Sequence, residues 1–359
     1  MRIKLELMQL EDRTVPTRLF DAAAGVLSVT GNSNGTGARY AFTNSLAFIR
    51  GQATPFIGYN GPVQSATGDV NGDGFADIVY GVGPGGGSFL QIIDGRTGTT
   101  VFPRAIPVYE PSFTGGINIA VTRLNLQGTD VIVVAPDQGG SARVQIFQLV
   151  GGQLQLLQNF FAIDDPAFRG GARVALGDIN GDGNEDLVVG AGFGGGPRVA
   201  IYNGATLLIP NVQPAKLIPD FFAFEPGLRD GVFVAVGDLN GDGFQDPIFG
   251  GGPGGGPRVT AYNGLAIAQG FVPNFGGPYL INFFAFDPSQ RGGVRVTVKN
   301  IDGDTFGDLV VGSGDNIVPQ TVITYLGRTM IFGTNIPPAP RQAFNPFSDP
   351  RPFAGVFVG

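Results

Sequence analysis

The stretch GDINGDGNEDLVVG at residues 177–190 decides the fold, because close copies of it recur along the chain. Two copies are GDVNGDGFADIVYG at 68–81 and GDLNGDGFQDPIFG at 237–250, and a fourth is KNIDGDTFGDLVVG at 299–312. A degenerate copy, TRLNLQGTDVIVVA, lies at 122–135, in the long gap between the first two. Internal repeats about 60 residues long indicate one small supersecondary unit that is stacked or arranged in a circle.

Each repeat contains four short segments with the pattern of β-strands. In the third repeat these are ARVALGD (172–178), DLVVGAG (186–192), GGGPRVAIYNG (194–204) and DFFAF (220–224). Short strands at even spacing, separated by Gly-rich turns, predict the four-stranded blades of a β-propeller. A β-helix coil would need fewer residues, and independent sandwiches would need longer units with their own cores. The predicted fold class is therefore all-β.

The two ends of the chain contain the strands that a last blade would need. FNPFSDPRPFAGVFVG (344–359) matches the end of one repeat plus the first strand of the next, and GVLSVTG (25–31), ARYAFTN (38–44) and ATPF (53–56) follow from the other end. At about 60 residues per repeat, the length predicts six blades, the last one closed by both termini. Closure would remove unpaired strand edges. The alternative is five blades with a separate N-terminal β-segment.

The predicted organisation is a polar segment at 1–17 followed by one propeller at 18–359. The propeller would contain N-terminal strands at 18–57, blades at about 58–330 and closing strands at 341–359. Residues 10–16, LEDRTVP, resemble a short signature near the start of many repeat-rich bacterial surface proteins, and a frayed polar terminus is the alternative. No apolar run of signal-peptide or membrane-spanning length is visible in the sequence.

The composition favours a folded chain and excludes several chemistries. The 60 Gly and 27 Pro occur beside a 43% hydrophobic share that includes 30 Phe, which a disordered chain would not carry. The absence of Cys and His excludes disulfides, zinc–thiolate sites and a Ser-His-Asp mechanism. A net charge of −7 argues against a nucleic-acid partner, because phosphate contacts need a basic surface.

The loop D-x-N-x-D-G-x-x-D gathers oxygen donors within nine residues and predicts a calcium site. Ca²⁺ accepts six to eight hard oxygen ligands in flexible geometry, and a glycine after the second Asp permits a sharp turn. Position 12 of each loop is apolar and the flanking segments are strands, so the loop is not an EF-hand. The predicted ligands, with position 7 acting through its carbonyl, are Asp69, Asn71, Asp73, Phe75 and Asp77; Asp178, Asn180, Asp182, Asn184 and Asp186; Asp238, Asn240, Asp242, Phe244 and Asp246; and Asn300, Asp302, Asp304, Phe306 and Asp308.

These four loops predict about four Ca²⁺ ions per chain. The alternative is a set of Asx turns without metal, but closely packed carboxylates would repel one another without a cation. The second repeat has Arg123 in place of the first Asp, so no calcium is expected there and Arg123 is expected to pair with Asp130. The fifth repeat is expected to bind most weakly for two reasons. Asn300 puts a neutral amide at the first position, and Thr305 replaces the turn glycine and would be strained at positive φ.

With these residues in view, the repeats resemble FG-GAP repeats, the blades of integrin-α-like β-propellers that also occur in many bacterial surface proteins. The resemblance covers about residues 55–330 and rests on GDxNGDGxxDLVVG followed by GxGGGPRVxxYNG. It implies a propeller that binds Ca²⁺ in the loop between the first two strands of a blade. The family's ligand positions match the residues given above.

Three other recurring features have simpler interpretations. The Gly-rich runs at 83–87, 192–196 and 252–256 lack the Lys-Ser/Thr of a phosphate-binding loop and predict tight turns between strands. Arg173, Arg198, Arg258 and Arg295 recur at strand positions, where they would form either stacked structural arginines or an anion-binding rim. The FFAF phenylalanines are predicted to lie in the core between blades: Phe221, Phe222, Phe224, Phe283, Phe284 and Phe286.

The sequence supports three hypotheses about function. The first is a non-enzymatic, calcium-stabilised propeller outside the cell that acts in adhesion, matrix binding or assembly, with a protein or polysaccharide as its partner. The second is a polysaccharide lyase or hydrolase on the same scaffold. The third is a self-assembling subunit whose terminal strand completes a neighbouring ring.

Overall fold

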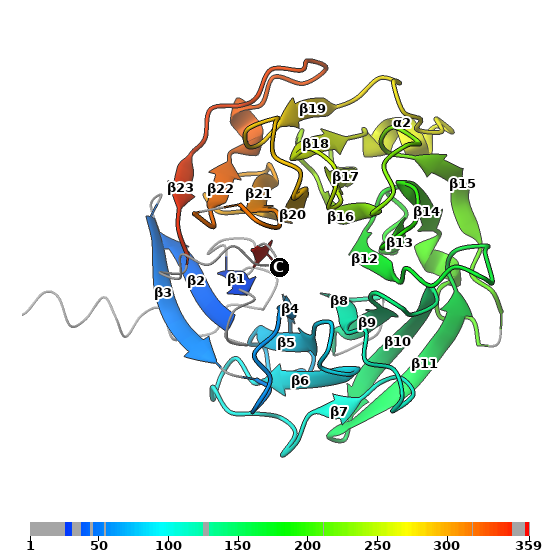
Figure 1. Cartoon of the computed structure of the whole chain (residues 1–359), viewed down its shortest axis with the longest axis vertical. Helices are drawn as coiled ribbons and strands as arrows, with labels where there is room; N and C mark the ends of the chain where they lie inside the picture. Colours follow the sequence, from blue (N-terminus) through cyan, green and yellow to red (C-terminus); the bar gives the residue numbers. More distant parts are fainter. Residues whose placement is uncertain are drawn as a thin grey trace, which may run out of the picture.

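The computed structural model describes residues 26–30, 37–43, 46–53, 55–124, 129–210, 212–317, 319–346 and 356–358, with the backbone alone described for the first three ranges. The predicted polar segment at 1–17 lies outside these residues. Blades of antiparallel strands are arranged in a ring around a central channel (Figure 1). The all-β class predicted from the repeats is therefore correct. A single domain over 18–359 stays a prediction.

Five blades are built from four consecutive strands each. Blade 1 contains β4 (Val63–Gly68), β5 (Asp77–Val82), β6 (Phe89–Ile93) and β7 (Ile106–Pro107). Blade 2 contains β8 (Ile117–Thr122), β9 (Val131–Pro136), β10 (Arg143–Val150) and β11 (Gln153–Phe161). Blade 3 contains β12 (Ala172–Gly177), β13 (Asp186–Ala191), β14 (Arg198–Tyr202) and β15 (Lys216–Phe222). Blade 4 contains β16 (Val232–Gly237), β17 (Asp246–Gly251), β18 (Arg258–Ala261) and β19 (Ile281–Phe284). Blade 5 contains β20 (Val294–Lys299), β21 (Asp308–Ser313), β22 (Val322–Tyr325) and β23 (Gln342–Phe344).

The first strand of each blade lines the channel, and the fourth lies at the outside of the ring (Figure 1). Short helical turns follow the third strand in three blades: η1 (Gly204–Thr206), α2 (Gly264–Ala268) and η2 (Gly327–Thr329). The first two begin at Asn203 and Asn263, whose side chains accept from backbone N–H groups as helix N-caps do. These turns bring the YNG part of the repeat close to the acidic loop of its own blade.

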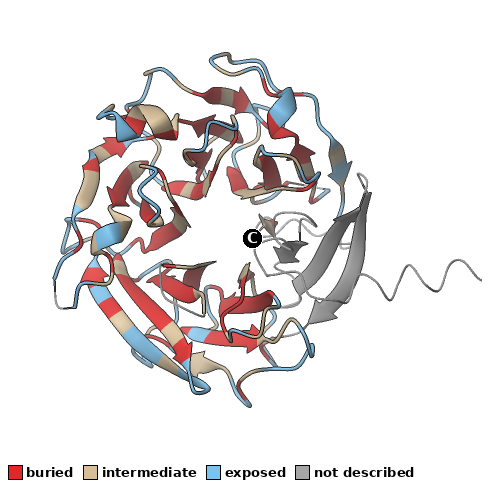
Figure 2. Cartoon of the chain, turned by 180° about the vertical axis from the view of Figure 1, so that it is seen from behind, coloured by how far each residue is buried: buried red, intermediate tan, exposed pale blue. Residues whose placement is uncertain are grey.

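The core lies between neighbouring blades, as Figure 2 shows by the buried inner and middle strands. All six residues are buried in each second strand, which explains the near-continuous apolar runs such as DLVVGA. One apolar cluster joins Val133 and Val144 of blade 2 to Val189 and Tyr202 of blade 3, and similar clusters join the other described pairs of blades. A blade therefore gains most of its apolar burial from its neighbours.

The prediction that every FFAF phenylalanine lies in this core is wrong for one position of the motif. Phe221 and Phe283 are buried, whereas Phe222 and Phe284 are 41% and 44% exposed. Successive side chains of a strand point to opposite faces, so only one of two adjacent phenylalanines can face the neighbouring blade. The outer strands thus carry an exposed aromatic residue in register with the first arginine of the third strand, as in Arg198↔Phe222 and Arg258↔Phe284.

The prediction of six blades is wrong, because the repeated four-stranded unit forms five. A sixth blade would place a full inner strand between β20 and β4. In the described part of the chain, the strand that lies there is β24 (Phe357–Val358), which has two residues. The Lys299 ammonium of β20 crosses this gap and donates to Thr67 Oγ1 of β4 at 3.1 Å. In three other blades the residue that matches Lys299 is glycine, as at Gly237, where a Cβ would meet Val298 of the next inner strand. A full neighbouring strand would exclude a lysine there.

The two ends of the chain form a further four-stranded sheet at this gap. Its strands are β24, β1 (Val26–Thr30), β2 (Gly37–Thr43) and β3 (Leu46–Ala53), in that order. β24 pairs antiparallel with β1 through Val29↔Val358 and Thr30↔Phe357. The described strands of this sheet do not contain the repeat motif. Its innermost strand, β24, and the next one, β1, come from opposite ends of the chain.

Candidate functional site

The acidic loops lie between the first and second strands of their blades. In blade 3 the loop runs from Asp178, directly after β12, to Asp186, the first residue of β13. Asp178 accepts from Asp182 N (3.0 Å) and Gly183 N (2.8 Å), so the chain curls around its first carboxylate. Gly183 adopts φ +83°, the left-handed region that glycine occupies at no steric cost. The loop of blade 4 has the same turn, with Gly243 N donating to Asp238 Oδ2 at 2.8 Å.

The last aspartate of each loop is buried and closes it. Asp186 Oδ2 accepts from Ile179 N and Asn180 N at 3.0 and 3.3 Å, which ties the end of the loop to its start. Its Oδ1 accepts from Gly204 N at 2.8 Å. Burial raises the pKa of Asp186 to about 6, and that of Asp246 to about 8, against the opposing effect of these N–H donors. Nearby carboxylates add to both upward pKa shifts, because each negative charge disfavours ionisation of the next carboxyl group.

The turn after the third strand contributes groups that sequence analysis did not find. Its glycine donates to the closing aspartate in four blades: Gly95 to Asp77 (2.9 Å), Gly204 to Asp186 (2.8 Å), Gly264 to Asp246 (2.9 Å) and Gly327 to Asp308 (3.0 Å). A Cβ at Gly204 would lie 2.5 Å from the Glu185 carbonyl oxygen, so no larger residue fits. The preceding residue also reaches the loop, as Asn263 Nδ2 does to Asp242 Oδ2 at 3.2 Å. The signal in blades 1, 3 and 4 was an Asn-Gly or Asp-Gly 18 residues after the closing Asp, whereas blade 5 has Leu326-Gly327.

The carboxylate, amide and carbonyl oxygens of these loops are ligands that suit calcium, although the described acidic side chains do not form a metal cluster. In the part of the chain that the structure describes, no three acidic side chains lie close enough together to hold a metal ion. The predicted ligands instead accept from backbone N–H groups of their own loop, as Asp182 Oδ1 does from Asn184 N at 2.8 Å. Within the described residues, no ion pair reaches Asp178, Asp182, Asp238 or Asp242. The loops of blades 3 and 4 thus gather hard oxygen donors and contain no basic side chain.

The loop of blade 2 carries a positive charge of its own. Arg123 Nε lies 3.2 Å from Asp130 Oδ1, which confirms the pairing expected from the sequence. Asp130 Oδ2 also accepts from Asp69 N of blade 1 at 2.8 Å. The closing aspartate is therefore neutralised by a guanidinium, in a loop that has lost the other acidic positions.

The loop of blade 5 departs from the others at Asn300, one of the two positions that the sequence suggested. Thr305 is not at positive φ: in the described chain the only such non-glycine residue is Asn316. The predicted strain at Thr305 is therefore wrong. The difference lies in Asn300, whose Nδ2 donates to the Asp304 carbonyl while its Oδ1 accepts from Gly303 N. An amide at the first position turns one of the two expected acceptor atoms into a donor.

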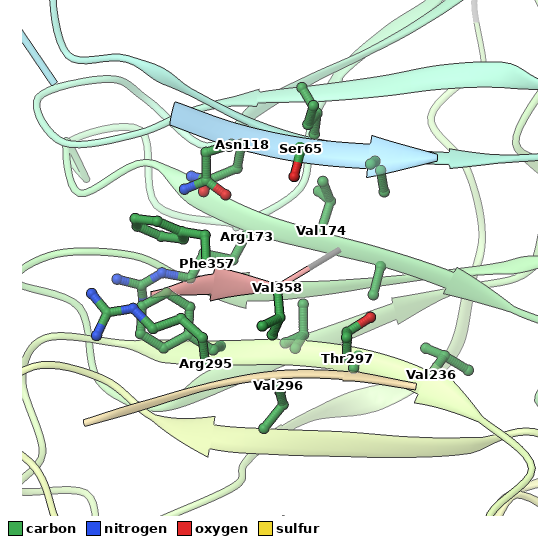
Figure 3. A pocket seen from close by; sticks show the side chains of 18 of the residues that line it. Ser65, Asn118, Arg173, Val174, Val236, Arg295, Val296, Thr297, Phe357 and Val358 are labelled. Atoms are coloured by element: carbon green, nitrogen blue, oxygen red, sulfur yellow. The ribbon is translucent and has the colours of Figure 1, made fainter. Parts of the chain in front are cut away.

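The four recurring arginines form two pairs at different distances from the channel. Arg173 and Arg295 are the second residues of the inner strands of blades 3 and 5 and lie together at one end of the central pocket, beside Phe357 (Figure 3). Their guanidinium carbons lie 4.0 and 4.7 Å from the Phe233 ring centroid, and Arg295 pairs with Asp315. Arg198 and Arg258 begin third strands and pair with Asp220 and Glu225. The pair Arg198–Asp220 joins two strands of blade 3, and the pair Arg258–Glu225 joins blade 4 to the segment that follows blade 3.

Comparisons with known proteins agree with the repeats. A model of the FG-GAP repeat family matches residues 61–99 and 170–205. Integrin alpha-3 from Mus musculus is 32% identical over 242 residues, which cover 60% of this chain and 21% of the integrin. Integrin alpha-4 from Xenopus laevis is 30% identical over 192 residues, 52% of this chain and 18% of that protein. This chain thus spans about a fifth of the length of the curated relatives it matches.

Similarity to solved structures occurs at low sequence identity. A rhamnogalacturonan lyase from Bacillus licheniformis has a TM-score of 0.43 and 12% identity, with 86% of this chain and 64% of that chain covered. The comparisons show that this chain carries FG-GAP repeats and is similar to integrin alpha chains, and the structure shows that the repeats form the blades of a β-propeller. Among the described residues, no helix has the length and apolar character needed to cross a membrane.

Proposed function

We propose that this chain is a calcium-stabilised, non-enzymatic propeller that acts outside the cell in adhesion, matrix binding or assembly. The observation that carries the proposal is the repeated acidic loop with a buried closing aspartate and no basic side chain, as in blades 3 and 4. Several carboxylates within one nine-residue loop repel one another unless a cation joins them. Calcium would supply that charge and link the first strand of a blade to the second.

The ligands proposed for the loops of blades 1, 3 and 4 are those of the motif. They are Asp69, Asn71, Asp73, Asp77 and the Phe75 carbonyl; Asp178, Asn180, Asp182, Asp186 and the Asn184 carbonyl; and Asp238, Asn240, Asp242, Asp246 and the Phe244 carbonyl. Extracellular calcium modules bind at about 10⁻⁴–10⁻³ M, which suits short loops of this kind outside the cell. The similarity to integrin alpha chains supports adhesion or matrix binding as the role, with a protein or polysaccharide as the ligand.

The test is thermal unfolding of the whole chain in calcium and in chelator. At tenfold excess of calcium over Kd each site adds about 1.4 kcal/mol, so three sites add about 4 kcal/mol. We expect a clearly lower Tm in chelator, restored by calcium and not by magnesium, which demands stricter octahedral geometry. An unchanged Tm would contradict the proposal.

A matched pair of variants locates the effect in the loops. Asp182→Asn removes a carboxylate that contacts only its own loop, and we expect it to reduce calcium binding by one ion. Asp165→Asn removes an exposed carboxylate outside the loops and should bind as much calcium as the wild-type chain. Equal calcium binding by both variants would argue against the ligand assignment.

A further inference from the structure

The loop of blade 5 has a guanidinium among its carboxylates. Arg328 Nη1 lies 3.0 Å from Asp302 Oδ2 and 3.4 Å from Asp304 Oδ2. These carboxylates stand at the third and fifth positions of the loop, where the other acidic loops offer calcium ligands. Arg328 belongs to η2, the turn whose glycine donates to the closing aspartate of the same blade. The positive charge is thus delivered by an element that already contacts the loop.

An arginine at this place in the repeat does not always enter the loop. Blades 3 and 4 have Ala205 and Leu265 there, which carry no charge. Blade 1 has Arg96, but its guanidinium carbon lies 5.5 Å from the centroid of the Phe75 ring. Within the residues that the structure describes, no ion pair joins Arg96 to Asp73. Arg96 therefore provides a natural control for the role of Arg328.

Two other changes in blade 5 reduce the oxygen donors around the loop. Asn300 offers an amide in place of a carboxylate, and its Nδ2 is used as a donor to the Asp304 carbonyl. Leu326 stands where blades 1 and 4 have Asp94 and Asn263, whose side chains contact loop residues. The loop has therefore lost calcium-type ligands and gained a cation at the same time.

We propose that Arg328 is an internal cation that takes the place of calcium in blade 5, so that the chain binds about three calcium ions and not four. The inference rests on the proposed calcium function of the other loops. Arg123 and Asp130 of blade 2 show the same solution in a second loop. Arginine stays protonated at any physiological pH, so this loop keeps its neutralising charge whether or not calcium is present. Blade 5, which borders the sheet formed by the chain ends, would thus remain closed without metal.

The decisive experiment counts calcium ions bound to the whole chain by equilibrium dialysis. We expect near three for the wild type and for Asn300→Asp, because Arg328 still fills the loop in that variant. The double variant Asn300→Asp with Arg328→Gln should bind one more ion. Arg96→Gln should leave the count unchanged. Four ions on the wild type or on Asn300→Asp, or no additional ion on the double variant, would overturn the inference.

A second measurement does not depend on calcium binding at the other loops. In chelator, Arg328→Gln should lower the Tm below that of Arg96→Gln, because it leaves three carboxylates without a cation. Equal melting of the two variants overturns the role of Arg328. A wild-type chain that binds no calcium at all would instead refute the proposed function, and the chelator comparison would still decide whether Arg328 is an internal cation.

Discussion

Glycines in this chain differ in whether their backbone φ requires glycine, and Gly183 of an acidic loop can be compared with Gly227 outside the loops. Gly183 and Gly227 are both exposed enough that an added Cβ would meet nothing within 4 Å, but only Gly183 has a positive φ, at +83°. An added methyl group therefore meets no steric contact at either position, but at Gly183 it would be strained by the positive φ. This pair separates conformational strain from steric contact.

We expect Gly183→Ala to lower the free energy of unfolding by about 1 kcal/mol, the cost of a non-glycine residue in the left-handed region. Gly227→Ala should be neutral or slightly stabilising, because it only restricts the unfolded chain. Urea denaturation of both variants in chelator measures the difference without a contribution from calcium. If Gly183→Ala proves as stable as Gly227→Ala, the turn does not need its positive φ.

The turn of an acidic loop could be predicted from the sequence because its signal is local. The order Asp178, Asn180, Asp182, Asp186 lies within nine residues, so the turn that brings them together could be read from the repeat. Gly204 is 18 residues after Asp186, and its contact with that carboxylate depends on the pairing of β13 with β14. Thr305 was expected to be strained because the loops of blades 1, 3 and 4 have glycine at the same position, but its φ is not positive.

At the level of strands and blades, Tyr202 and Tyr325 at the ends of third strands connect neighbouring blades. The Tyr202 hydroxyl of blade 3 donates to the Ala162 carbonyl of blade 2 at 2.9 Å. Its ring also meets Phe160 edge-on, with centroids 5.1 Å apart. Tyr325 of blade 5 makes the corresponding bond to Ala285 of blade 4, but at 3.4 Å. The two tyrosines thus provide the same contact with good and poor hydrogen-bond geometry.

We expect Tyr202→Phe to lower the free energy of unfolding by about 1–2 kcal/mol, because it leaves a buried carbonyl without its donor. Tyr325→Phe should cost less, since the lost hydrogen bond is long. Chemical denaturation of the two variants under the same conditions provides the comparison. A larger effect at Tyr325 than at Tyr202 would mean that the hydroxyl bond between blades is not what the tyrosine contributes.

At the scale of the whole molecule, the ring is closed by a contact between the two chain ends, β24 with β1. Composition and chain length do not predict this contact. The repeat period was read correctly, and each second strand fell where the apolar run predicted it. Dividing 359 residues by the period could not show that the innermost terminal strand has only two residues. Lys299 in place of the repeated glycine was the available signal, because a lysine does not fit against a full inner strand.

The closure of the ring depends on a few residues near the C-terminal end. Val356 is fully buried against Val310, Val322 and Leu326 of blade 5, and its N–H donates to the Ser313 carbonyl at 2.9 Å. Strand β24 then pairs with β1. This pairing within one chain competes with the alternative in which the same strand completes a neighbouring ring, a competition that deletion of the strand can reveal.

We expect deletion of residues 356–359 to destabilise the chain more than Val356→Ala, which keeps the backbone pairing and costs about 2 kcal/mol for the lost methyl groups and the cavity. The deletion exposes strand edges at the gap, and exposed edges promote association between chains. Chemical denaturation and size-exclusion chromatography should therefore show a less stable protein that elutes partly as dimers or larger species, while Val356→Ala stays monomeric. A deletion variant that is monomeric and as stable as Val356→Ala would show that β24 does not close the ring.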